Sequence, residues 1–257
     1  MLTELIADLR DEHSDLVAIV EQVDLDLPVP SEPWDVRDVV SHLLVGDAKA
    51  RLAAVDPEAF AAELPAVLAD PVAFLDGWLD VGRGRTKADL LADWRCGFEH
   101  LAEALGALTA DRRVPWYGPP MSAASSATAR LMEYWAHGQD VVDGSGRSRL
   151  PTARLRHVAH LGVRTRRFSY AVRAVTPPDG EVRVSLRAPD GSTWEWGSGP
   201  DAVEGSALDF CLRVTQRRHR DDTDLVATGP LSDDWLDHAQ CFAGLPTEGR
   251  APLQKGT

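Results

Sequence analysis

The stretch EYWAHGQDVVD, residues 133–143, places acids and a histidine inside a segment whose apolar residues are spaced as in a buried helix. Glu133 and His137 are four residues apart, and Asp140 follows three residues later. On an α-helix this spacing keeps the three side chains within one narrow arc, with about 40° between the first two. The stretch therefore predicts one helix of a bundle, with a polar group of side chains on one face.

Working outward, the first 150 residues show helical periodicity separated by clear breaks. The three prolines of LDLPVPSEP cannot continue a helix, and the two Asp-Pro pairs at 56–57 and 70–71 are read as interruptions. Asp35 and Thr86 are suitable N-caps. The predicted helices cover residues 3–23, a segment beginning at 35, residues 72–108 with a break near 82–86, and residues 122–142. Antiparallel helices with one longer connection predict a four-helix bundle.

After residue 150 the pattern changes to a small α+β unit. A helix is predicted over 154–170, and Asp190-Gly191 is a hairpin turn between two strands with alternating apolar residues. A helix near 205–214, a short strand at 224–229 and a helix capped by Ser232 and ending at Gly244 follow. We therefore predict a mainly α protein with a bundle at 1–148, an α+β domain at 149–250 and a loose tail at 251–257.

Composition narrows the class of function. Residues 1–150 hold 13 Lys and Arg against 26 Asp and Glu, whereas residues 151–257 hold 14 of each. An acidic first half argues against a nucleic-acid partner, because phosphate binding needs a basic surface. No apolar run approaches the roughly 20 residues that span a bilayer. The first residues are acidic and amphipathic, unlike a signal peptide, which has a basic region followed by an apolar one. We expect a cytoplasmic protein, a monomer or a homodimer, with no membrane partner.

Cysteine and histidine usage points away from a disulfide framework. The three cysteines, Cys96, Cys211 and Cys241, are odd in number and widely spaced, which predicts free thiols. The stretch PWDVRDVVSHLLVGD, residues 33–47, places His42 at the margin of an apolar helical stripe. Asp47 falls within that stripe and needs a buried partner.

Two interpretations of the polar residues stay open on spacing alone. Glu133 and His137 could form a hydrogen bond at the edge of the bundle, and His42 could be an ordinary core histidine. If the second and fourth helices are neighbours, the same three residues would form a two-histidine, one-glutamate site with an open position, which is typical of catalytic zinc.

The chain resembles the mycothiol-dependent maleylpyruvate isomerase group, within the wider family of DinB-like four-helix bundles. PWDVRDVVSHLLVGD and EYWAHGQDVVD carry the resemblance in the bundle. RHVAHLGVRTRRFSY, VTQRRHRDDTDLVATGP and DDWLDHAQCFAG resemble an actinobacterial branch that carries a "wyosine base formation" or metal-binding label. The resemblance implies a DinB-like bundle followed by a small C-terminal domain, which we expect to be sterol-carrier-like. Scattered cysteines do not suit the radical iron–sulfur chemistry of a literal wyosine enzyme.

The resemblance also implies a site. It assigns His42, Glu133 and His137 to a divalent metal, usually zinc, with nickel or another ion as an alternative. Mycothiol would then be the co-substrate, bound as thiolate at the open position. Asp140 would orient His137 or anchor the helix end. The family's substrate-binding arginine has Arg83 and Arg85 as its only candidates here, and exposed loop charges are the alternative reading.

Three functions follow from these residues. The first is a metal-dependent enzyme that uses mycothiol for isomerisation or for sulfur transfer to a small electrophile. The second is a protein that binds a metal and a small molecule without catalysis. The third is a metal-assisted hydrolase with water as the nucleophile.

Overall fold

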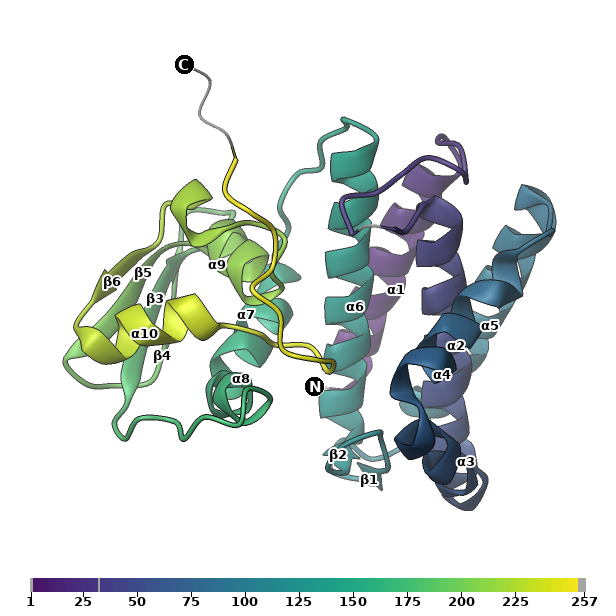
Figure 1. Ribbon diagram of the computed structural model, residues 1–257, viewed down its shortest axis with the longest axis horizontal. Helices are drawn as coiled ribbons and strands as arrows, with labels where there is room; N and C mark the ends of the chain where they lie inside the picture. The colour runs from purple at the N-terminus through teal and green to yellow at the C-terminus, as the bar shows by residue number, and fades with distance from the viewer. Residues whose placement is uncertain (1, 32, 254–257) are drawn as a thin grey trace. The chain divides into compact units, whose positions relative to one another are not determined.

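A computed structural model describes residues 2–31 and 33–253. The chain divides into two compact units, residues 1–148 and residues 149–257 (Figure 1). The first unit consists almost entirely of helices, and the second combines helices with a four-stranded sheet. The predicted mainly α fold is confirmed.

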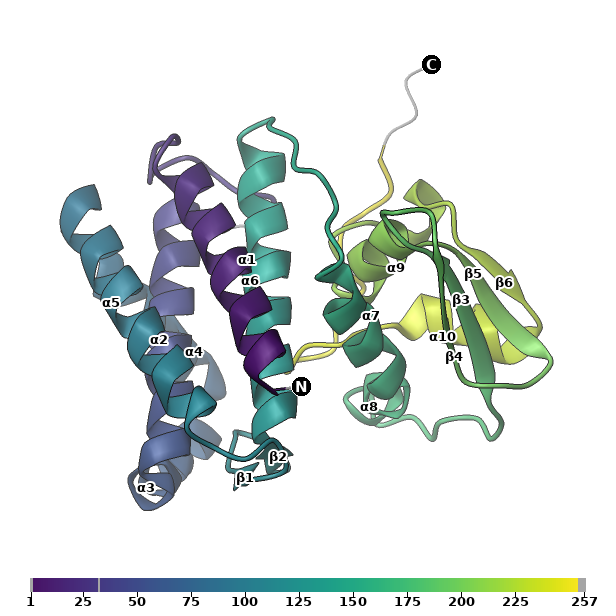
Figure 2. The same ribbon diagram turned by 180° about the vertical axis from the view of Figure 1, so that it is seen from behind.

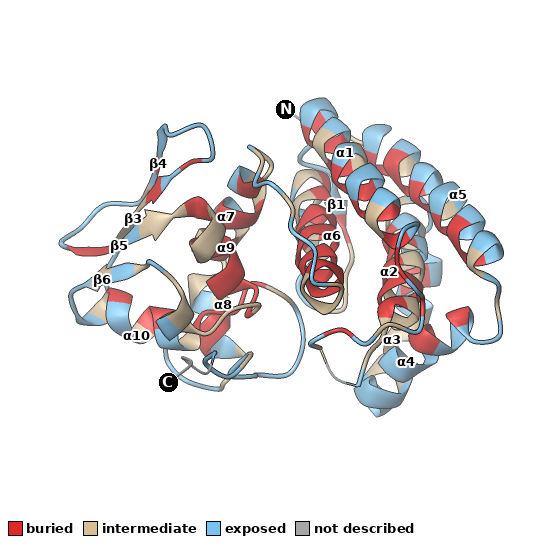
Figure 3. Ribbon diagram, turned by 90° about the horizontal axis from the view of Figure 1, so that it is seen from above, coloured by how far each residue is buried: buried red, intermediate tan, exposed pale blue. Residues whose placement is uncertain are grey.

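Four long helices form the bundle of the first unit. Helix α2 packs against α5 and α6, and α1 packs against the same two helices (Figures 1 and 2). Nearly every residue of α6 from Arg130 to Val142 is buried, so α6 is the most enclosed helix of the bundle (Figure 3). The bounds of the bundle helices are α1 (Leu2–Val20), α2 (Val36–Val55), α5 (Lys87–Gly106) and α6 (Ala123–Gly144).

The helix starts follow local capping chemistry. Asp35 accepts a hydrogen bond from the Asp38 backbone, and the Asp38 side chain accepts one from the Asp35 backbone, which completes a capping box. Thr86 caps α5 and Ser122 caps α6 through side-chain oxygens. The predicted N-caps Asp35 and Thr86 are confirmed. Each satisfies backbone N–H groups that have no partner within the helix.

Both Asp-Pro pairs start helices. The sequence predicts a helix from residue 72, next to the second pair, but not the helix that follows the first pair. Asp56 and Asp70 each accept a backbone N–H three residues ahead, and the following proline occupies the first helical turn. A proline fits there because its missing N–H would have no partner anyway. The resulting elements are α3 (Pro57–Ala69), α4 (Pro71–Leu79) and the 3-10 turn η1 (Asp80–Gly82). A hairpin of β1 (Arg113–Val114) and β2 (Met121–Ser122) precedes α6.

The second unit contains a four-stranded sheet with strand order β4-β3-β5-β6. Strands β3 and β4 form the predicted antiparallel hairpin, with Leu186 opposite Trp194. Strand β5, which pairs parallel to β3 in the centre of the sheet, is not predicted from the sequence. Its residues, DAVEGS, lack the alternation of polar and apolar side chains that marks a strand. The strands are β3 (Val182–Arg187), β4 (Thr193–Trp196), β5 (Asp201–Ser206) and β6 (Val226–Thr228).

The helices of this unit differ from the prediction at two places. The single helix expected over 154–170 is broken at Thr165 into two. Ser232 was expected to cap the last helix, but it lies inside it and donates to the carbonyls of Thr228 and Gly229. That helix also ends at His238 instead of Gly244. The elements are α7 (Leu155–Arg164), α8 (Arg166–Ala171), α9 (Ala207–Val214), the turn η2 (Arg220–Asp222) and α10 (Pro230–His238).

Across residues 2–31 and 33–253, no helix has both the length and the hydropathy needed to cross a bilayer.

Candidate metal centre

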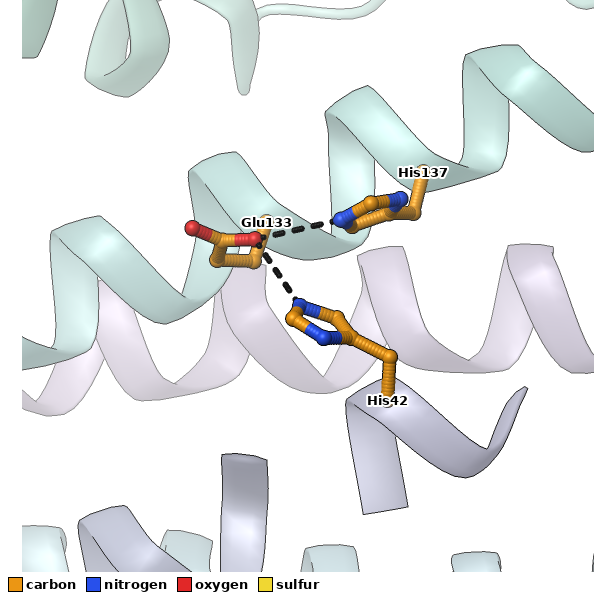
Figure 4. Close-up of side chains that lie close together, drawn as sticks. All are labelled: His42, Glu133 and His137. Atoms are coloured by element: carbon orange, nitrogen blue, oxygen red, sulfur yellow. Dashed lines mark ion pairs between the residues drawn. The ribbon is translucent and has the colours of Figure 1, made fainter. Parts of the chain in front are cut away.

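Three side chains from two helices converge in the bundle. His42 projects from α2, and Glu133 and His137 project from successive turns of α6 (Figure 4). Glu133 Oε2 lies 3.5 Å from His42 Nε2 and 3.3 Å from His137 Nε2. One potential ligand atom from each residue lies within 4.8 Å of the other two. The structure therefore brings together the three predicted ligands.

Two of the three separations between these ligand atoms are longer than a typical charge-assisted hydrogen bond and match the spacing of ligands around one cation. A charge-assisted N–H···O bond is about 2.7–2.9 Å long. Ligands about 2.0–2.2 Å from a tetrahedral metal are separated from one another by roughly 3.3–3.6 Å. The two measured separations of 3.3 and 3.5 Å fall in the second range. Two imidazoles and a carboxylate are also a donor set that zinc accepts.

The protonation states suit metal binding. Burial lowers the pKa of His42 to about 4, although its hydrogen bond with Glu133 acts in the opposite direction. Burial acts to raise the pKa of Glu133, but its hydrogen bonds with His137 and His42 outweigh that effect and hold the pKa well below its usual range. At neutral pH the His42 imidazole is neutral and the Glu133 carboxylate is ionised. These are the forms that bind a cation.

Asp140 supports the site from the next turn of α6. Its Oδ2 lies 3.2 Å from His137 Nδ1, and its side chain is fully buried. A carboxylate on Nδ1 fixes the imidazole orientation and leaves Nε2 facing Glu133. This contact is compatible with the predicted role of Asp140 in orienting His137.

Two indole rings flank the histidines. The Trp34 ring stacks on His137 with centroids 5.5 Å apart and an interplanar angle of 15°. Trp34 also lies 5.2 Å from the His42 ring, and Trp78 of α4 lies 5.5 Å from it. The side chains of His42, Glu133 and His137 keep only 17, 22 and 10% of their surface exposed. The site is therefore half-enclosed by apolar rings, which reduces its contact with water.

Arg130 is the buried partner of Asp47, and the sequence alone does not identify it. Arg130 Nε and Nη2 donate to Asp47 Oδ1 at 3.1 and 2.9 Å, and the Tyr134 hydroxyl donates to Asp47 Oδ2. Trp94 Nε1 donates to the Tyr134 oxygen at 2.8 Å. Arg130 lies one turn before Glu133, and this i, i+3 spacing from a candidate ligand is the signal that the sequence offers for it.

Arg83 and Arg85 lie outside the cluster of ligands. Arg83 pairs with Asp80 at 2.8 Å, and its side chain is 68% exposed. Arg85 pairs with Asp93, and its backbone carbonyl accepts a hydrogen bond of 3.0 Å from Arg37 Nη1. Substrate binding by Arg83 therefore stays a prediction from the resemblance.

Comparison with known proteins defines the family. Residues 6–142, which include all three candidate ligands, match the family described as Mycothiol maleylpyruvate isomerase N-terminal domain. The chain belongs to this family. The chain is also similar to two relatives over nearly their whole length: the uncharacterized proteins MT0041 and Rv0036c of two Mycobacterium tuberculosis strains are each 46% identical to it over 250 residues. The match covers 95% of this chain and 97% of each relative.

Solved structures of a mycothiol-dependent maleylpyruvate isomerase share the fold. One superimposes with a TM-score of 0.58 at 15% identity and covers 90% of this chain and 96% of the isomerase. A histidine-to-alanine mutant of that enzyme superimposes with a TM-score of 0.54 at 16% identity over the same shares. At this identity the likeness establishes the fold alone, and because it covers 90% of this chain it includes the second unit as well as the bundle.

Proposed function

We propose that this chain is a divalent-metal-dependent enzyme that uses mycothiol for isomerisation of a small electrophile or for sulfur transfer to it. The convergence of His42, Glu133 and His137 carries the proposal, because three protein ligands leave at least one coordination position open. Membership of the mycothiol maleylpyruvate isomerase family supports the choice of thiol.

The proposal assigns a role to each residue of the site. His42, Glu133 and His137 would hold the cation, with zinc as the first choice of metal. When bound, the cation supplies positive charge that lowers the pKa of a thiol at the open position. Asp140 holds the His137 ring in the orientation that presents Nε2. The Trp34 and Trp78 rings exclude water from the two histidines and strengthen electrostatic interactions there.

Metal content tests the site. Purified protein is expected to hold about one divalent ion per chain, as measured by inductively coupled plasma mass spectrometry. His42→Ala and His137→Ala each remove a ligand and are expected to lower that stoichiometry several-fold. His100→Ala changes a histidine on α5 outside the cluster and serves as the matched control. Full metal occupancy in both ligand variants would contradict the proposed centre.

Turnover tests the reaction. A panel of small electrophiles is incubated with the metal-loaded protein, with and without mycothiol. We expect product only when the thiol is present, and loss of product in His137→Ala. Equal rates with and without mycothiol would overturn thiol dependence and favour hydrolysis by water. A bound metal with no turnover on any electrophile would identify a binding protein instead of an enzyme.

A further inference from the structure

A second group of side chains next to His42 has hydrogen-bonding capacity that the metal centre does not use. Trp78 of α4 lies 5.5 Å from the His42 ring, and 6.2 Å from Tyr117 in the connection between β1 and β2. Phe60 and Phe74 lie on the Tyr117 ring as well, with centroids 5.0 and 5.7 Å from it. These four residues, Phe60, Phe74, Trp78 and Tyr117, are called the aromatic group below.

Two polar atoms of the aromatic group are buried without a partner. Neither Trp78 Nε1 nor the Tyr117 hydroxyl has a hydrogen-bond partner within residues 2–31 and 33–253. Trp78 is only 6% exposed. Buried donors are almost always paired in proteins, so each exception calls for an explanation. Two such donors on neighbouring rings, beside a candidate metal ligand, point to a ligand that supplies the missing acceptor.

The chemistry of the donors defines what they can bind. An indole N–H only donates. Burial, followed by the negative charge of Glu63, raises the pKa of Tyr117, so the phenol keeps its proton at neutral pH and can donate as well. In the part of the chain that the structure describes, each of the two donors lacks an acceptor oxygen, and their rings are neighbours with centroids 6.2 Å apart. The surrounding aromatic faces favour a planar, conjugated body that stacks or packs edge-on.

The charges near the aromatic group argue against an anionic ligand there. Lys49 lies 5.9 Å from the Phe74 ring, but its ammonium contacts both carboxylate oxygens of Glu63 at 2.7 Å. Arg130, whose positive charge acts on His42, is also paired with an acid, Asp47. Because each of these cations already has an acidic partner, a carboxylate in the aromatic group would lose its hydration without gaining a counter-ion.

We propose that Trp78 Nε1 and the Tyr117 hydroxyl form a subsite that binds the acceptor oxygen of an uncharged, planar conjugated molecule, such as an aryl ketone. The subsite lies directly beside His42, so it would hold such a molecule next to the metal centre. Only the statement that this molecule is the substrate rests on the proposed function. The binding itself does not.

Three probes of similar shape test the subsite. Acetophenone has the acceptor oxygen, ethylbenzene lacks it, and benzoate adds a full negative charge. Binding to the full chain is measured by ligand-observed NMR titration, with a chelator present and no thiol, so that neither metal nor turnover contributes. Acetophenone is expected to bind about ten-fold more tightly than either of the others.

Variants identify the donors. Tyr117→Phe removes only the hydroxyl and is expected to weaken acetophenone binding about 3- to 10-fold while leaving ethylbenzene binding unchanged. Trp78→Phe is expected to weaken it similarly. Trp235→Phe is the matched control, because Trp235 Nε1 is also buried without a partner in the described residues but belongs to the second unit. Its binding of acetophenone is expected to equal that of the unsubstituted protein.

The outcomes separate this proposal from the proposed function. Equal affinity for acetophenone and ethylbenzene, tighter binding of benzoate, absence of binding by all three probes, or unchanged acetophenone affinity in Tyr117→Phe would each overturn the subsite. Donor-dependent ketone binding by a protein that shows no thiol-dependent turnover would support the subsite and remove the enzymatic proposal.

Discussion

Arg130 of α6 and Asp47 of α2 form a fully enclosed ion pair in which two guanidinium nitrogens donate to the same carboxylate oxygen, at 3.1 and 2.9 Å. The pair ties together the two helices that carry the candidate metal ligands. Gly46 makes room for it, since a Cβ at that position would lie 2.8 Å from Arg130 Nη1. The spacing between His42 and the pair Glu133 and His137 therefore depends on a charged contact in the core.

Removing one partner of this pair is expected to be costly. Asp47→Ala leaves the Arg130 guanidinium buried without its counter-ion, which typically destabilises a protein by about 3–5 kcal/mol. The double variant Asp47→Leu with Arg130→Met replaces both charges by apolar groups and is expected to be more stable than Asp47→Ala. Urea unfolding followed by circular dichroism measures both. A loss below about 1 kcal/mol in Asp47→Ala would contradict the importance of the pair.

Asp140 is expected to tune metal affinity without binding the ion. Asp140→Asn keeps the shape of the side chain but removes the charge that faces His137 Nδ1 at 3.2 Å. Loss of such a supporting carboxylate typically weakens metal binding about 10- to 100-fold. Competition with a chromogenic chelator gives the affinity. Asp143→Asn, one residue before the end of the same helix, is the control and should leave the affinity unchanged.

His13 is expected to make the bundle sensitive to acid. The ring is buried and stacks on Phe98 with centroids 3.8 Å apart. Burial first, and then the nearby positive charge of Arg95, lowers the pKa of His13 from 6.5 to about 4. Since the unfolded chain binds the proton more readily, the full stability is present above about pH 6.5 and is lost as the pH falls towards 4.

The size of this effect can be measured with one substitution. At pH 5 the His13 contribution corresponds to about 2 kcal/mol of lost stability relative to neutral pH. His13→Phe keeps an aromatic ring and removes the titrating group. Its free energy of unfolding is expected to fall by about 2 kcal/mol less than that of the unsubstituted protein between pH 7.5 and pH 5. Parallel pH profiles for the two proteins would show that His13 does not contribute.

Gly82 is expected to be essential for the contact of η1 with α2. A Cβ built at Gly82 would lie 2.1 Å from Ser41 Oγ, which is itself fully buried and bonded to the Arg37 carbonyl. Gly82→Ala should destabilise the protein by about 1–3 kcal/mol through overpacking. Gly77→Ala in α4 meets no atom within 4 Å, and it should be neutral or stabilise by up to about 1 kcal/mol. Thermal unfolding of the two variants distinguishes them.

Local chemistry explains which parts of the fold could be predicted. Helix starts at Asp35 and Thr86 depend on one side chain and the next three residues, so they are visible in the sequence. Strand β5 depends on its neighbours instead. It pairs with β3 on one side and with β6 on the other. This pairing and the burial that comes with it hold the segment as a strand, although its residues do not alternate between polar and apolar. Ser232 also could not be placed from the sequence. A serine can cap a helix start, but here its hydroxyl donates to the carbonyls of the earlier residues Thr228 and Gly229.

The sequence by itself determined that Glu133, His137 and Asp140 share one face of a helix, because three- and four-residue spacings place side chains on the same side of any α-helix. Only the tertiary structure decided that His42 faces them, since the packing of α2 against α6 is a contact between residues about ninety positions apart. The same packing supplied Arg130 as the partner of Asp47 and placed Trp78 beside His42. Such contacts depend on how the apolar surfaces of different helices pack together. The helical periodicity of one segment does not predict which other helix it packs against.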